Sequence, residues 1–332
     1  LDARQYCTLD TEECAKIQCA KIHSTSKRLL LFSMLVNIAR WTQKSVPERA
    51  AALKKPQLLS IPYSHYVELA RWSMLLSGVD FDEYGYVPGQ HVLPVLNLRW
   101  GGEKKHVAKS SSVSHAAGGK SNFTGVPVLV MPDGCVHNDS WDIANQASGL
   151  APLLDSESKH FYDTQLGPDV RQMAYNHFLA PANEHVWHKM ASDSVLFGSA
   201  WSWTWSLGVG RLMTTKLRDM FKCDDAAAVA ATQVAVEKHF SGWLSERVER
   251  KTGKYLNGDE ISVEDVAFAS LCAVAVMPDL YCGGKFRAYF DEIVEADESI
   301  RQTRDAARST AAGRYVLWFY EQHRPEGLAF TQ

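Results

Sequence analysis

Residues 58–78 read LLSIPYSHYVELARWSMLLSG and combine a short apolar strand, a turn that contains Pro62, and an amphipathic helix. Ser64 stands just before the helical periodicity, where its hydroxyl is expected to cap the helix by accepting from backbone N–H groups of the first turn. Gly78 is expected to end the helix, because glycine readily adopts the left-handed conformation found there. A thiolate or another anion beside Ser64 would be stabilised by unpaired N–H donors and by the helix dipole.

The order of elements around this helix predicts a parallel pair of strands. Val67, Ala70, Met74 and Leu75 mark one apolar face of the helix. Residues 81–87 then form a second strand, and a strand–helix–strand unit implies a parallel pair with a right-handed crossover.

Later segments predict a hairpin and then helices only. Residues 126–131 and 135–137 form two short strands joined by a Pro-Asp-Gly turn. Asp139 and Ser140 begin a helix, either as simple caps or as groups that face a ligand. Strand signals stop after residue 152, and Ser262 with Asp265 forms a capping box before a strongly apolar helix.

Three motifs together resemble glutathione S-transferases. SHYVELARW at 64–72 is similar to the S-P-W-S-E-K-A-R-W helix start of the serine-type group. TGVPVLV at 124–130, followed by DSWDIA at 139–144, is similar to the family's V-P-V-L strand and its acidic-residue-plus-Ser helix start. GDEISVEDVA at 258–267 resembles the capping motif of the C-terminal helical domain.

The resemblance implies an α/β domain followed by an all-α domain. We expect an N-terminal extension at 1–55, a thioredoxin-like glutathione-binding domain at 56–150, an all-helical domain at 151–325 and a tail at 326–332. The family is often dimeric, so a homodimer or a larger protein assembly is expected.

The resemblance also implies a reaction and a site. Glutathione would be the co-substrate, and its thiolate would be transferred to, or exchanged with, a small hydrophobic electrophile. Ser64 would be the catalytic residue, donating a hydrogen bond to the sulfur. The residues expected to bind glutathione are Tyr63, His65, Tyr66, Val126, Pro127, Asp139 and Ser140.

Individual roles within this site follow from the resemblance too. Pro127 stands where the family has a cis-proline, which turns the backbone of Val126 outward to pair with a peptide. Asp139 and Ser140 would hold the γ-glutamyl end. His65 occupies a position where the motif carries proline, and no cysteine stands at 64 or 67. Redox chemistry of the cysteine type is therefore not expected.

An alternative is a non-catalytic structural or interaction subunit of a larger assembly, organellar or membrane-associated. It is suggested by His65, by an apolar run at 29–38, by a long irregular stretch at 88–123, and by alternating tryptophans at 201–205. The tryptophans favour packing or a partner surface over a hydrophobic substrate wall. A fold does not fix a function, so both interpretations stay open.

The apolar run at 29–38 is ten residues long, whereas a helix needs about 20 to span a bilayer. Three interpretations remain: a helix packed on the domain or on a partner, an interfacial membrane helix that makes membrane contact, or the remnant of a targeting segment.

Composition excludes several classes of protein. The 332 residues are 46% hydrophobic and 22% charged, which is typical of a soluble globular chain. A formal net charge of −3 argues against a nucleic-acid partner. The seven cysteines form no C-x-x-C pair and His185 with His188 lacks further ligands, so no metal site is indicated.

Free thiols fit a reducing intracellular compartment, either the cytoplasm or an organelle such as a plastid or mitochondrion.

Overall fold

The structure is a computed structural model and describes residues 53–92, 94–95, 125–146, 149–152, 155–193 and 207–326. Several features named above lie outside these residues. They are the apolar run at 29–38, three of the seven cysteines (Cys7, Cys14 and Cys19), most of the stretch at 88–123, the tryptophans at 201–205 and the end of the tail.

A small mixed sheet contains four strands within the described residues. The strands are β1 (Gln57–Ser60), β2 (Asp82–Gly85), β3 (Val128–Val130) and β4 (Val136–His137), in the order β2-β1-β3-β4. β1 is parallel to β2 and antiparallel to β3, and β4 is antiparallel to β3. The parallel pair and the hairpin expected from the sequence are both confirmed.

Helix α3 (His65–Leu76) is buried on two faces. Val67, Ala70 and Met74 pack against the sheet together with α5 (Ser140–Gln146). Trp72 packs instead into the core of the later helices. The helix ends as expected, because Gly78 has a positive φ of 67° and its N–H donates to the carbonyl of Leu75.

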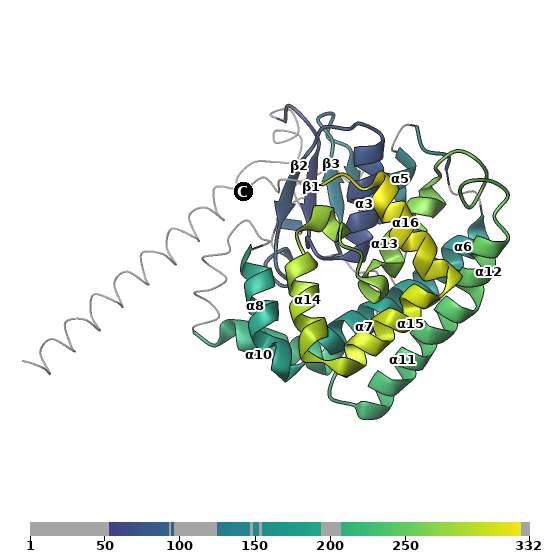
Figure 1. Cartoon of the computed structure of the whole chain (residues 1–332). Helices are drawn as coiled ribbons and strands as arrows, with labels where there is room; N and C mark the ends of the chain where they lie inside the picture. The colour runs from purple at the N-terminus through teal and green to yellow at the C-terminus, as the bar shows by residue number, and fades with distance from the viewer. Residues whose placement is uncertain are drawn as a thin grey trace, which may run out of the picture.

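The described chain beyond residue 155 is helical. Its elements are α6 (Ser156–Phe161), the π-helical η1 (Tyr162–Leu166), α7 (Gly167–Phe178), the 3-10 turn η2 (Pro181–Asn183), α8 (Glu184–Asp193), α10 (Val209–Met220), α11 (Ala226–Ser241), α12 (Trp243–Glu249), α13 (Val263–Val276), the 3-10 turn η3 (Tyr281–Gly284), α14 (Arg287–Ala296), α15 (Glu298–Ser309) and α16 (Ala311–His323). Figure 1 shows these helices grouped beside the sheet, with α3 and α5 on the side that faces them. None of the helices in the described ranges has both the length and the apolar composition to cross a bilayer.

Helix α13 is the centre of the helical region. All of its residues are buried, and it packs against α3, α7 and α16. The predicted capping box is confirmed: the N–H of Asp265 donates to Ser262 Oγ (3.3 Å), and the N–H of Ser262 donates to Asp265 Oδ2 (2.8 Å). A capped start fixes where this fully buried helix begins.

A buried ionic network centred on Arg71 joins α3 to the sheet. The guanidinium of Arg71 donates to both carboxylate oxygens of Glu83 on β2, at 2.7 and 2.5 Å. It also donates to Glu68 (2.6 Å) and to the carbonyl oxygen of Pro62 (3.0 Å). Arg71 and Glu68 are fully buried and Glu83 is nearly so. The turn before Ser64 is therefore held from inside the protein.

The same network reaches the C-terminal end of the described chain. Arg324 donates to Glu68 Oε1 at 2.7 Å, and the N–H of Cys282 donates to the same oxygen at 3.1 Å. Burial alone would raise the pKa of Glu68, but the charges of Arg324 and Arg71 outweigh it and hold the pKa below its usual range. Glu68 is therefore a buried carboxylate whose charge depends on two arginines.

We predict that Arg324→Met lowers the free energy of unfolding by about 3–5 kcal/mol, because it leaves a buried carboxylate with one cation fewer. Urea unfolding at neutral pH measures the change. The matched control is Arg301→Met, which removes an exposed partner of Glu298 and should cost about 0–1 kcal/mol. Equal losses in the two variants would contradict a stabilising role for this network.

Candidate functional site

Ser64 lies at the start of α3, but it does not cap the helix as expected. Its backbone has the extended conformation of an N-cap residue (φ −79°, ψ 130°), whereas its side chain makes no capping hydrogen bond. The expectation was wrong because the backbone conformation of a cap does not by itself turn the hydroxyl back over the first turn. The hydroxyl is therefore available to a ligand at a helix N-terminus.

The sheet brings three of the predicted segments to one end. β1 leads at its carboxyl end into the turn that carries Ser64. β3 is antiparallel to β1, so Val126 and Pro127 precede it at that same end. β4 is antiparallel to β3, so Asp139 and Ser140 follow it there as well. We call this the Ser64 end of the sheet.

The backbone before β3 has the expected conformation. The peptide bond between Val126 and Pro127 is cis, which confirms the prediction for Pro127. Pro127 is buried, while Val126 is half-buried. The described structure therefore has a cis-proline at the Ser64 end of the sheet.

Asp139 and Ser140 are both buried at the start of α5, with exposures of 3% and 6%. Asp139 Oδ1 accepts a hydrogen bond from the N–H of Trp141 at 2.7 Å, so the capping interpretation describes part of its role. Burial raises the pKa of Asp139. Trp141 in turn donates through its indole N–H to Asp163 of η1 (2.7 Å). This part of the site therefore touches the helical region.

Tyr63 points toward the helical region. Its ring meets Trp187 edge-on at 5.3 Å and Phe286 at 6.2 Å. Its hydroxyl is buried without a hydrogen-bond partner, and burial raises its pKa. The phenol therefore keeps its proton at neutral pH.

His65 is buried, with 3% exposure, and its ring lies 4.4 Å from that of Tyr66. Burial and the nearby charge of Arg171 lower its pKa from 6.5 to about 3, against the smaller effect of a hydrogen bond with the backbone of Gly167. Its Nε2 has no hydrogen-bond partner. A neutral imidazole therefore stands next to Ser64.

Tyr66 is packed against the first residue of α7. A Cβ placed on Gly167 would lie 2.0 Å from Tyr66 Oη, so the phenol occupies the space that a side chain would need. Burial also raises the pKa of Tyr66. Since Tyr66 belongs to the first turn of α3, α7 runs directly past the turn that carries Ser64.

Several residues of the helical region lie at this site but were not predicted from the sequence. Asp163 of η1 accepts a hydrogen bond from the indole of Trp141, and Gly167 of α7 lies against the hydroxyl of Tyr66. The charge of Arg171, also on α7, lowers the pKa of His65. No motif marks them, because their place beside α3 results from packing between distant segments. A lone arginine or glycine on an expected helix carries no such signal.

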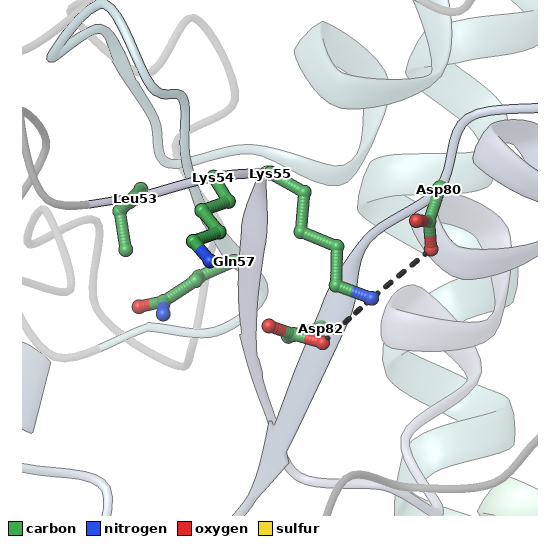
Figure 2. A pocket seen from close by; sticks show the side chains of 6 residues that line it. All are labelled: Leu53, Lys54, Lys55, Gln57, Asp80 and Asp82. Carbon is green, nitrogen blue, oxygen red and sulfur yellow. Dashed lines mark hydrogen bonds and ion pairs between the residues drawn. The ribbon is translucent and has the colours of Figure 1, made fainter.

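A surface hollow of about 470 Å³ lies at the opposite end of the sheet. It adjoins the amino ends of β1 and β2, and Figure 2 shows Lys55 between Asp80 and Asp82. Lys55 Nζ lies 3.1 Å from Asp80 and 2.9 Å from Asp82. These charges already satisfy one another, and the hollow is separate from the predicted residues.

One of the two histidines considered as metal ligands, His185, has another contact, whereas Nε2 of the nearby His177 is buried without a hydrogen-bond partner. His185 lies 2.9 Å from Glu292. Burial lowers the pKa of His177 to about 4. Within the ranges that the structure describes, no three His, Cys, Asp or Glu side chains gather as a metal site would require.

Comparison with known proteins gives matches in structure only. No protein-family model matches the sequence, and no curated protein matches it. The structure is similar to a glutathione S-transferase of Ceriporiopsis subvermispora in complex with glutathione, with a TM-score of 0.51 and 12% identity, covering 83% of this chain and 100% of that one. A glutathione transferase of Phanerochaete chrysosporium with oxidized glutathione matches with a TM-score of 0.40 and 11% identity, covering 77% and 96% of the two chains.

The chain therefore has the glutathione S-transferase fold. The small mixed sheet followed by helices confirms the predicted thioredoxin-like region and the helical region after it.

We predict that His65 makes the protein less stable in mild acid. Its native pKa is depressed to about 3, so below pH 6.5 the unfolded chain takes up a proton that the native state does not. Between pH 7.5 and pH 5 this effect should remove about 2 kcal/mol from the free energy of unfolding. In His65→Gln, the loss of stability between pH 7.5 and pH 5, measured by urea unfolding, should be about 2 kcal/mol smaller than in the wild type.

The test has an internal comparison. His177→Gln should reduce the pH dependence independently, because burial depresses that pKa as well, and the double variant should combine the two effects. An unchanged difference between the two pH values in His65→Gln would show that the pKa of His65 is the same in the native and unfolded states, and would contradict the prediction.

Proposed function

We propose that this protein is a glutathione transferase that joins the glutathione thiolate to a small hydrophobic electrophile. The observation that carries the proposal is the arrangement at the Ser64 end of the sheet. This end contains the hydroxyl of Ser64, which makes no capping hydrogen bond, at the N-terminus of α3. It also contains the cis peptide bond before Pro127 and the buried Asp139 at the start of α5. The similar structure from Ceriporiopsis subvermispora contains glutathione, which supports the proposal.

Ser64 would stabilise the nucleophile. Its hydroxyl donates a hydrogen bond to the sulfur, and the N-terminus of α3 favours the charged form, so the pKa of the bound thiol falls. The thiol proton passes to solvent, the thiolate attacks the electrophilic carbon, and a C–S bond forms. The leaving group departs with its bonding electrons, so the reaction needs no oxidant or metal.

Three segments would hold the peptide. The backbone N–H and C=O of Val126 pair with the cysteinyl part in the manner of an added strand. Asp139 and Ser140 hold the γ-glutamyl end, and the bond from Trp141 N–H fixes the orientation of the Asp139 carboxylate. The tripeptide would then lie along the Ser64 end of the sheet with its sulfur toward α3.

The surroundings of Ser64 suit an apolar second substrate. The rings of Trp187 and Phe286, which are buried in the helical core, contact Tyr63 behind the turn and make its surroundings apolar. Neutral His65 and protonated Tyr63 and Tyr66 add no negative charge that would oppose a thiolate. Such a site favours an anionic sulfur facing an apolar electrophile.

We predict that Ser64→Ala lowers kcat for glutathione conjugation of 1-chloro-2,4-dinitrobenzene by at least ~10-fold, the loss expected for one hydrogen bond to a charged group. The apparent pKa of the reaction should rise. Ser64→Thr keeps the hydroxyl and should retain most of the activity. Unchanged turnover in Ser64→Ala would remove Ser64 from this role.

We predict that Asp139→Ala weakens glutathione binding by ~10-fold or more, because the amino group of the peptide loses a charged partner. Calorimetry on the whole chain measures the dissociation constant. Glu260→Ala, which removes an exposed acid far along the chain, is the control and should leave it unchanged. Equal affinity in the wild type and Asp139→Ala would place the γ-glutamyl end elsewhere.

A second candidate function is a non-catalytic interaction subunit. The observation that favours it is an exposed apolar surface on α10, where Leu212 is 62% and Met220 is 69% exposed. A contiguous exposed apolar patch often marks a contact with another protein. Absence of glutathione binding, with the chain recovered only in a large complex, would favour this function over the transferase.

A further inference from the structure

Arg171 of α7 carries a charge that no acidic side chain of the described residues binds, although its guanidinium lies 5.8 Å from the ring of Phe221. No hydrogen bond or ion pair joins it to any residue that the structure describes, and its Nε is buried. Arg71 and Arg324, by contrast, are bound to carboxylates. A buried donor without an acceptor costs free energy, so a native structure that keeps one calls for an explanation such as a ligand group.

The position of Arg171 places it beside the candidate site. Gly167, Arg171 and Tyr175 recur every four residues and therefore share one face of α7. Gly167 lies against the hydroxyl of Tyr66. Tyr175 stacks on Phe221 at 4.1 Å, and the guanidinium lies 5.8 Å from the same ring. Arg171 thus lies one helical turn after Gly167, the residue that contacts Tyr66, and close to the ring of Phe221.

Two further polar groups around Ser64 are unsatisfied. Nε2 of His65 and the hydroxyl of Tyr63 are buried without hydrogen-bond partners, and these residues flank Ser64 in the chain. The charge of Arg171 acts on both His65 and Tyr66. The nearby acid Asp163 is already paired with Lys159 and with the indole of Trp141. A cation therefore faces the site with its charge uncompensated.

We propose that Arg171 binds a carboxylate on the second substrate, so that the electrophile is an aromatic or similarly flat apolar acid. This inference rests on the proposed transferase function. A guanidinium binds a carboxylate through two parallel hydrogen bonds, and the rings of Tyr66, Tyr175 and Phe221 around it suit an aromatic body. Glutathione would lie along the sheet, whereas Arg171 belongs to the helical region.

The test compares two substrates that differ in charge alone. 4-Chloro-3,5-dinitrobenzoate and 4-chloro-3,5-dinitrobenzamide both react with glutathione: a C–S bond forms, the C–Cl bond breaks, chloride leaves and the thiol proton goes to solvent. The readout is kcat/KM for each compound divided by its uncatalysed rate constant. The wild type should prefer the carboxylate by ~10-fold or more, as expected for a charge-assisted hydrogen bond.

Arg171→Gln should remove that preference by lowering kcat/KM for the carboxylate ~10-fold further than for the carboxamide. Arg171→Lys keeps the charge but cannot make two parallel hydrogen bonds to a carboxylate, so it should retain only part of the wild-type preference. The matched control is Arg211→Gln, an exposed arginine of α10 that pairs with Glu184. It should leave both rates unchanged.

Several outcomes would overturn the proposal. They are an equal loss with both compounds, a preference that survives in Arg171→Gln, and a wild type without preference, in which case water alone satisfies Arg171. Weaker glutathione binding in Arg171→Gln by calorimetry, with the preference unchanged, would assign the residue to the peptide instead.

Failure of the transferase function itself is distinguishable. If the wild type turns over neither compound, binding of the unreactive 3,5-dinitrobenzoate and 3,5-dinitrobenzamide by calorimetry decides the role of Arg171 without glutathione. Tighter binding of the benzoate that Arg171→Gln abolishes would support the carboxylate site. Equal binding of the two compounds, or none, would refute it.

Discussion

The candidate site depends on the buried guanidinium of Arg71. It donates hydrogen bonds of 2.5–3.0 Å to Glu83 on the sheet, to Glu68 on its own helix and to the backbone of Pro62 in the turn. Because a guanidinium is planar and its donors are fixed in direction, these contacts define where α3 starts relative to β2. Ser64 follows Pro62 by two residues, so its position follows from a network that it does not touch.

The ionic network around Arg71 consists of paired charges, whereas most titratable groups around Ser64 are neutral. Two arginines and two glutamates balance in the network, and removing one partner leaves a charge that water cannot reach. Around Ser64 the histidine is neutral and the tyrosines keep their protons. Arg171 is unpaired beside them. The first arrangement stabilises the fold, while the second leaves room for an anion supplied from outside the chain.

The helical region does more than support the sheet. Its α7 begins with Gly167, whose missing side chain admits Tyr66, and the π-helical η1 before it places Asp163 against Trp141. A π-helical turn shifts the facing of residues along a helix, and such turns are frequent at functional sites. The side of the site opposite the sheet is therefore formed by residues that come a hundred positions after Ser64.

Short-range signals in the sequence determined much of this protein. The strand, turn and helix at 58–78, the stop at Gly78 and the capping box of Ser262 and Asp265 all involve partners within a few residues, whereas the cis bond before Pro127 was expected from the family resemblance alone. Such partners interact in nearly any context, because the backbone brings them together as soon as it turns. The resemblance to glutathione S-transferases added the order of the two regions.

Only the tertiary structure decided the rest. Glu68 and Arg324 are 256 positions apart, and nothing in either local sequence marks them as partners. The same holds for Tyr66 with Gly167, and for Arg171 beside His65. Even Ser64, whose backbone has the expected conformation of an N-cap residue, makes no capping hydrogen bond with its side chain. Such contacts arise from the packing of whole helices, in which the close fit of many side chains fixes where each polar group lies.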